Sequence, residues 1–172
     1  MGLRLIIGGA RSGKSAHAQS LAEAEAQRRG GAAVMIATAE APDDEMRERI
    51  ARHRAERGAG WRTVETPLEL AEAIARLDPA DCAVVDCLTL WLSNLMFTER
   101  DLEAATEALL QAAGRSASEI IVVTNEVGMS IVPENALARR FRDEAGRLNR
   151  RVAERADQVT VMFAGIPLVL KG

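Results

Sequence analysis

Tyrosine is absent from the 172-residue sequence, aromatic residues make up only 3% of it, and cysteine and histidine occur twice each. The two cysteines, Cys82 and Cys87, flank an apolar segment. Neither has a histidine or a further cysteine at the spacing of a zinc ligand, which argues against a zinc site built on them. We therefore expect both thiols to be buried and to pack as small hydrophobic side chains.

An excess of basic residues is also lacking, because 22 Lys and Arg face 25 Asp and Glu and the net charge is -3. Sequence-independent binding of nucleic acid needs a broadly basic surface, so we expect no nucleic-acid partner. No apolar stretch reaches the roughly 18 residues of a membrane span. The strand-like run 3–7 begins without the cationic segment of a signal peptide. We expect a cytoplasmic protein with no membrane span.

Short apolar runs alternate with helix-like segments along the chain, as in an α/β protein. The runs are continuous in Val and Ile rather than alternating with polar residues, which is typical of a mainly parallel sheet with helices on both faces. A length of 172 residues suits a single domain, residues 1–172. The expected strands are 3–7, 32–37, 82–88, 119–124 and 158–164. The expected helices are 14–29, 42–56, 68–77, 101–113 and a long one from Pro133 to Arg155.

A phosphate-loop pattern, G-x-x-x-x-G-K-[ST], follows the first expected strand and precedes the first expected helix. Its glycines let backbone N–H groups point at phosphate oxygens, and the helix N-terminus adds partial positive charge. Lys14 supplies a cation, and the Ser15 hydroxyl is placed to bind Mg²⁺. A glycine-rich turn that only caps a helix is the alternative. The predicted triphosphate site comprises Gly8, Gly9, Ala10, Arg11, Ser12, Gly13, Lys14 and Ser15.

Asp86 closes the apolar run Cys82 to Val85 of the third expected strand, and an acidic residue at such a strand end commonly holds Mg²⁺ directly or through water. It could instead cap a helix that begins at Leu88. We expect metal or nucleotide contact, with Ser15 and Asp86 as the metal ligands.

His53 lies on one helical stripe with Met46, Ile50 and Arg57. A neutral imidazole between arginines could attack an α-phosphate and form a nucleotidyl-histidine. The residues alone favour the alternative, a partly buried histidine in a solvated, Arg-rich helix. His17, in the first helix, is read as an ordinary helix residue.

Five segments together carry a family resemblance: GGARSGKS, DDEMRERIARHRAER, WRTVE, VVDCLTLWLSNLM and VTNEVGMSIVPENALARRFRDEAGRLNRRVA. They resemble the bifunctional adenosylcobinamide kinase and adenosylcobinamide-phosphate guanylyltransferase family of cobalamin biosynthesis. The resemblance runs from Leu3 to Lys171, and its NEVG and RRFRDEAGRLN segments are more specific than the phosphate loop.

The resemblance implies a P-loop NTPase fold of the RecA-like branch, a homotrimer, and ATP and GTP as substrates. The implied enzyme phosphorylates adenosylcobinamide, then transfers GMP from GTP through a guanylylated histidine and releases pyrophosphate. His53 stands where that histidine is expected, although Arg52 occupies a position where some relatives have a second histidine. The further nucleotide-site residues implied by the resemblance are Thr38, Ala39, Glu40, Arg54, Ala55, Glu56, Arg57, Glu65 and Asp86.

Asn125 and Glu126 follow the fourth expected strand, where α/β sheets place ligand groups. They could bind the acceptor or only fix the loop. Arg139, Arg140 and Arg142 are expected on a solvated helix face or at a contact between subunits. Two other functions remain open: a simple P-loop kinase of another metabolite without nucleotidyl transfer, and a nucleotide-dependent binding or switch module.

Overall fold

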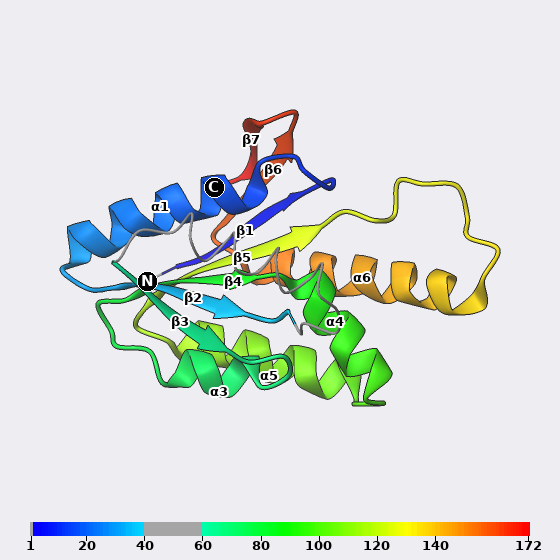
Figure 1. The fold of residues 1–172 in the computed structure, drawn as a ribbon, viewed down its shortest axis with the longest axis horizontal. Helices are drawn as coiled ribbons and strands as arrows, with labels where there is room; N and C mark the ends of the chain where they lie inside the picture. Colours follow the sequence, from blue (N-terminus) through cyan, green and yellow to red (C-terminus); the bar gives the residue numbers. More distant parts are fainter. Residues whose placement is uncertain (1, 40–59) are drawn as a thin grey trace.

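A computed structural model describes residues 2–39 and 60–172, and within them the chain forms one layered α/β unit (Figure 1). The strands are β1 (Leu3–Gly8), β2 (Ala33–Ala37), β3 (Trp61–Glu65), β4 (Cys82–Asp86), β5 (Glu119–Asn125), β6 (Gln158–Phe163) and β7 (Ile166–Lys171). The helices are α1 (Lys14–Arg29), α3 (Leu70–Ala75), α4 (Leu88–Phe97), α5 (Leu102–Arg115) and α6 (Ala136–Arg155). None of these helices is long and apolar enough to cross a membrane.

All seven strands belong to one sheet in the order β3-β2-β4-β5-β1-β6-β7. Strands β1 to β6 pair in parallel, and β7 returns antiparallel along β6. Since the strands are parallel, the carboxyl ends of β1, β2, β4 and β5 meet at one edge, where α/β proteins bind ligands. The expected α/β class with a mainly parallel sheet and flanking helices is confirmed.

Helices cover both faces of the sheet, as Figure 1 shows. On one face α1 buries Ala18, Ala22 and Ala26, which are spaced four residues apart and let the helix approach the strands closely. Alternate residues of β5 divide between the two faces, with Ile121 on the α1 side and Ile120 in the larger core beneath the other helices. That larger core is filled by α3, α4, α5 and α6.

The five expected strands are all present, and two more were not expected. Those two, β3 and β7, occupy the edges of the sheet. The helix expected at 68–77 is shorter, because only Leu70–Ala75 is helical. Gly30 ends α1 in the left-handed conformation, with φ 70°. The helix expected at 42–56 lies outside the described residues.

Side chains cap the two later helices. Asp101 accepts hydrogen bonds from the backbone N–H groups of Glu103 and Ala104 at the start of α5. Asn135 accepts one from Ala138 N at the start of α6. Before α6, the segment 126–135 leaves the sheet as a long projecting loop, drawn in yellow in Figure 1.

Candidate active site

The phosphate loop lies between the end of β1 at Gly8 and the start of α1 at Lys14. Two of its residues have positive φ, Gly13 at 92° and Arg11 at 55°. Gly8 cannot be replaced without movement, because an added Cβ would lie 2.4 Å from the backbone oxygen of Met162. The strand, loop and helix context that the pattern predicted is therefore present, and α1 directs its N-terminus into the loop.

Lys14 is largely buried and turns back onto its own loop. Its Nζ donates to Gly9 O at 2.5 Å and lies 3.4 Å from Ser12 Oγ. Burial lowers the pKa of Lys14, whereas the nearby Cys87 and Asp86 oppose that shift. Asp86, at the end of β4, is therefore close enough to Lys14 to affect the pKa of the lysine. A cation and a carboxylate thus lie close enough to interact, as a nucleotide site requires.

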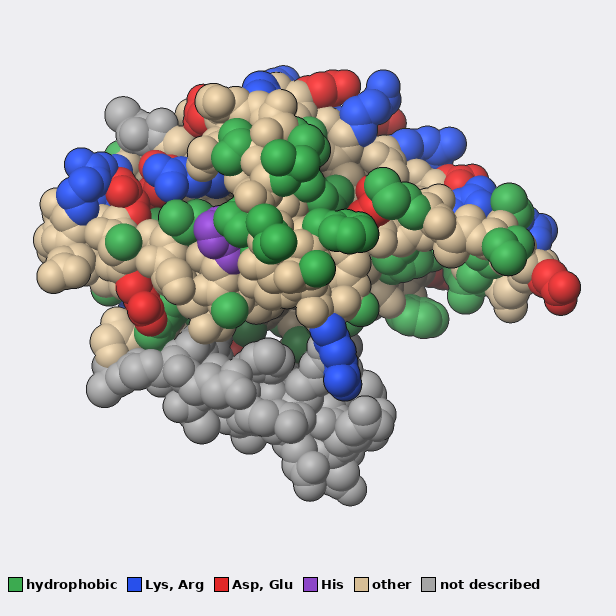
Figure 2. Space-filling model, turned by 90° about the horizontal axis from the view of Figure 1, so that it is seen from above, with side chains coloured by type: hydrophobic (Ala, Val, Ile, Leu, Met, Phe, Trp, Pro, Cys, Tyr) green, Lys and Arg blue, Asp and Glu red, His purple; other side chains and the backbone are tan. Residues whose placement is uncertain are grey.

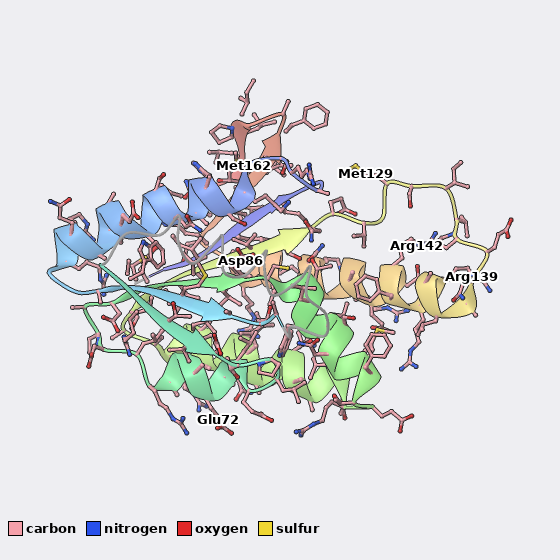
Figure 3. The ribbon with its side chains drawn as sticks, viewed as in Figure 1. Glu72, Asp86, Met129, Arg139, Arg142 and Met162 are labelled. Carbon is pink, nitrogen blue, oxygen red and sulfur yellow. The ribbon has the colours of Figure 1, made fainter. Side chains whose placement is uncertain are left out.

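The turn between β6 and β7 supports the phosphate loop from the side. Gly165 N donates to Ser12 O at 3.1 Å, and a Cβ on Gly13 would lie 3.4 Å from Gly165 Cα. Met162, labelled in Figure 3, belongs to the same hairpin. This turn is not among the site residues predicted from the sequence. A glycine between two apolar runs was its only sequence signal, and that signal predicts a turn without saying what the turn contacts.

Asp86 occupies the last position of β4 (Figure 3). Ala37 of β2 is in register with Asp86 on one side and with Glu65 of β3 on the other, so the ends of these three strands lie side by side. The residue that caps α4 is Cys87, not Asp86, and it makes no side-chain cap. The alternative role of Asp86 as a helix cap is therefore wrong.

Thr38 joins β2 to β4 and α4 at this edge through hydrogen bonds. Its buried hydroxyl donates to Cys87 O at 2.8 Å and accepts from Cys87 N at 2.9 Å. Its backbone oxygen accepts from Asn94 Nδ2 at 2.9 Å. These bonds fix the ends of β2 and β4 to α4. Contact of Thr38, or of its neighbour Ala39, with nucleotide stays a prediction.

Both cysteines are free and buried, as the sequence predicted. Burial raises the pKa of Cys82 to about 12. Burial also raises the pKa of Cys87, and the charge of Asp86 adds to that shift. Thiolates are therefore disfavoured beside the phosphate loop at neutral pH.

Asn125 and Glu126 lie where β5 ends, next to the phosphate loop. Asn125 is in register with Gly8, and Glu126 N donates to Gly8 O at 3.0 Å. The Glu126 carboxylate accepts from Gly128 N at 2.6 Å, so it fixes its own turn. Binding of an acceptor by either residue stays a prediction.

Two arginines of α6 act on nearby backbone and side-chain groups. Arg139 donates to Pro133 O and Glu134 O, which fastens the projecting loop to the helix. Arg142 pairs with Asp143 at 2.9 Å. Both arginines lie near the outer end of α6 in Figure 3, beyond the end of the sheet. Arg140 is exposed, as expected of a solvated face.

Comparison with known proteins identifies the family. Residues 4–170 match the family model described as cobinamide kinase / cobinamide phosphate guanyltransferase. The chain belongs to this family.

Relatives in the cobinamide kinase / guanyltransferase family align along nearly their whole length. The chain is 49% identical to the bifunctional adenosylcobalamin biosynthesis protein CobP of Pseudomonas aeruginosa, covering 98% of this chain and 96% of the relative. It is 41% identical to the bifunctional adenosylcobalamin biosynthesis protein CobU of Salmonella typhimurium, covering 97% and 98% respectively. The CobU protein of Escherichia coli is 39% identical over the same shares.

A solved structure shows the same fold at low sequence identity. The flagellar accessory protein FlaH from Methanocaldococcus jannaschii superposes with a TM-score of 0.54 at 14% identity, covering 99% of this chain and 78% of that chain. At this identity the likeness concerns the fold alone. It agrees with the P-loop NTPase fold expected from the sequence.

Several predicted site residues of this family member lie outside the described residues. The proposed nucleophile His53 is among them. The others are Glu40, Arg54, Ala55, Glu56 and Arg57.

Proposed function

We propose that the protein phosphorylates adenosylcobinamide with ATP or GTP and then transfers GMP from GTP to adenosylcobinamide phosphate. The products of the second step are adenosylcobinamide-GDP and pyrophosphate. The observation that carries this proposal is the phosphate loop of a cobinamide kinase / guanyltransferase family member, with Lys14 inside it and Asp86 acting on that lysine.

The loop 8–15 would hold the triphosphate in both steps. Its backbone N–H groups and the N-terminus of α1 provide donors and partial positive charge for the β- and γ-phosphates. Lys14 would leave Gly9 O and bind phosphate oxygens instead, exchanging one hydrogen bond to a neutral carbonyl for stronger charge-assisted ones. Its cation would stabilise the charge that develops during phosphoryl transfer.

The residues at this edge fit Mg²⁺. The ion prefers oxygen ligands and usually combines one or two protein groups with water and substrate phosphates. Among the described residues no group of three or more His, Cys, Asp or Glu forms a metal cage. Mg²⁺ that is bound together with a nucleotide does not need such a cage, because phosphate oxygens and water supply the other ligands. Ser15 and Asp86 would hold it, and the ion would neutralise charge on the phosphates.

His53 is the proposed nucleophile of the second step. Its neutral ring nitrogen would attack the α-phosphorus of GTP, forming an N–P bond while the bond to the β-phosphate oxygen breaks and pyrophosphate leaves. A phosphate oxygen of the acceptor would then attack the same phosphorus and release the imidazole. Support comes from the residues around His53, where Arg54 and Arg57 can neutralise phosphate oxygens.

Labelling with α-³²P-GTP tests this route. We expect label on the intact protein that survives denaturation and base but is lost in acid, as a phosphoramidate is. His53→Ala should abolish the label and keep the kinase step, and His17→Ala is the matched control that should label normally. Kinase turnover without labelling of the wild-type protein would identify a simple kinase. Neither turnover nor labelling, with slow hydrolysis only, would identify a switch module.

A homotrimer in the cytoplasm is proposed for the assembled enzyme. Its support is exposed apolar surface on β7, where Ile166, Leu168 and Leu170 are each more than half exposed. Surface of this kind on a soluble chain commonly marks a contact with another protein. In Figure 2 hydrophobic side chains gather on the face that carries the β6–β7 hairpin.

A further inference from the structure

On the side of β4, the backbone of Asn125 is held by side chains rather than by a neighbouring strand. The last register pair between β4 and β5 joins Asp86 to Val123, so β4 has ended before Asn125. The N–H and C=O of Asn125 would then lack partners on that side, which costs free energy in a partly buried position. Asn125 N donates to Thr89 Oγ1 at 2.9 Å, and Asn149 Nδ2 donates to Asn125 O at 3.1 Å.

Two further contacts close these bonds into a ring. Thr124 Oγ1 donates to Asn149 Oδ1 at 2.8 Å, and Thr89 Oγ1 lies 3.5 Å from Thr124 Oγ1. A hydroxyl carries a single proton, and that of Thr124 is committed to Asn149. Thr89 is therefore the donor in the last contact. Donation runs in one direction, from Asn125 N through Thr89, Thr124 and Asn149 and back to Asn125 O.

The ring is partly buried and joins three elements. Thr124 and Asn149 are only 2% and 6% exposed, and the four residues come from α4, β5 and α6. A fully satisfied polar network in a buried position has strong directional preferences and admits few arrangements. Replacing one member leaves the others without partners. The ring therefore sets where the end of β5 lies relative to both helices.

The end of β5 in turn contacts the phosphate loop. Glu126, the next residue, donates its N–H to Gly8 O at 3.0 Å, and Gly8 is the first residue of the loop. The β1 side of this segment is thus bound to the loop while the β4 side is bound to the ring. A shift at Asn125 would move the peptide that anchors Gly8.

We propose that Thr89 and Asn149 are positioning residues for the nucleotide site. Through the hydrogen-bonded ring on Asn125 they fix the end of β5, and through Glu126 they fix the first residue of the phosphate loop. This role does not require either side chain to touch the nucleotide. This inference rests on the proposed function only in that the loop binds nucleoside triphosphate.

Matched variants test the proposal. Thr89→Val keeps the shape and removes the hydroxyl, whereas Thr89→Ser keeps the hydroxyl. Asn149→Asp keeps the size and replaces the Nδ2 donor to Asn125 O with an acceptor. The control is Thr106→Val on α5, which also loses a buried hydroxyl, one that donates to Leu102 O at 2.7 Å. All are compared in the full-length protein with circular dichroism and thermal unfolding as folding checks.

The primary readout is the affinity for a fluorescent GTP analogue, which needs no corrinoid substrate. A displacement of about 1 Å caused by a distant mutation can lower a reaction rate about a hundredfold, so for a smaller shift of the loop we expect Thr89→Val and Asn149→Asp to weaken binding by about tenfold. Thr89→Ser and Thr106→Val should bind within about twofold of wild type. The kinase step should show the loss in kcat/KM for the nucleotide.

One result with these variants would overturn the proposal. Thr89→Val with wild-type GTP affinity would overturn the proposal, since the hydroxyl would then be purely structural. If Asn149→Asp fails to fold, Thr89→Val against Thr89→Ser still decides. If the wild-type protein binds GTP but is not labelled at His53, the guanylyl-transfer route is wrong. The proposal about the ring is tested separately, by the GTP affinities of the variants.

Discussion

Cys87 is close enough to Lys14 of the phosphate loop to affect the pKa of that lysine, and its thiol is a conceivable nucleophile there. Its thiol is buried, and burial together with Asp86 raises its pKa. The pKa of Cys82 is raised to about 12. The reactive form of cysteine is the thiolate, whose population falls tenfold for each unit by which the pKa exceeds the pH. The covalent intermediate should therefore not be a cysteine adduct.

Alkylation measures this directly. At pH 8 both thiols should react with iodoacetamide much more slowly in the native protein than in urea, because the pKa values lie above the pH and the sulfur atoms are buried. Mass spectrometry of timed samples gives the two rates. Cys87→Ala should keep the GMP label. Rapid native alkylation, or loss of label in Cys87→Ala, would contradict this account.

At the residue scale, the sequence predicted the site residues that lie together in one short segment of the chain. The phosphate loop is contiguous, and its strand and helix context could be recognised from the flanking residues. Thr38 differs, because its hydroxyl partner Cys87 lies 49 positions away in the chain. The Thr89 and Asn149 ring joins segments that only tertiary packing brings together. No local pattern could have predicted either arrangement.

At the element scale the β6–β7 hairpin supports the site. Its turn places Gly165 with φ 82°, and Gly165 N binds Ser12 O. An L-residue in this conformation is strained. The turn is thus held in a shape that keeps one hydrogen bond on the phosphate loop.

Two glycine variants distinguish an effect of the hairpin on GTP binding from an effect on the stability of the whole protein. Gly165→Ala and Gly30→Ala both place a Cβ at positive φ, 82° and 70°, and neither Cβ would meet another atom within 4 Å. Each should therefore lower the free energy of unfolding by about 1 kcal/mol. Gly165→Ala alone should weaken GTP binding, because its strain falls on the turn that contacts Ser12. Urea denaturation and titration with the GTP analogue measure both. Equal GTP affinities would show that the hairpin does not shape the loop.

The sequence predicted the inner strands and missed the two edge strands for one physical reason. Inner strands are buried on both faces and read as continuous apolar runs. Strand β3 has no buried residue, and β7 is exposed along its whole length and contains Pro167. Proline is tolerated at a sheet edge, yet in a sequence it argues against a strand. Edge strands therefore gave no clear signal.

At the scale of the whole molecule, the exposed face of β7 predicts self-association. Leu168 on β7 is 58% exposed, and Phe97 on α4, which is 76% exposed, is the matched control. We expect light scattering to give three times the chain mass of 18.5 kDa for the wild type. Leu168→Glu should reduce that mass by burying an unpaired charge in the contact, whereas Phe97→Glu should not. A monomeric wild type would contradict the trimer, and an unchanged Leu168→Glu would exclude β7 from its contact.

Both proposed reactions require that Lys14 and the loop around it bind a triphosphate. The chain contains one other lysine, Lys171, whose Nζ donates to the carbonyl groups of Ala153, Glu154 and Ala156 at the end of α6. Lys171→Ala should lower thermal stability and leave nucleotide affinity unchanged. Charge-assisted hydrogen bonds contribute about 1.5–3 kcal/mol, so Lys14→Ala should weaken binding by about ten- to a hundredfold.

Calorimetric titration of GTP with Mg²⁺ into wild type, Lys14→Ala and Lys171→Ala is the deciding measurement. We predict a large loss of affinity in the first variant and none in the second. Wild-type affinity in Lys14→Ala would contradict the assignment of residues 8–15 as the triphosphate site.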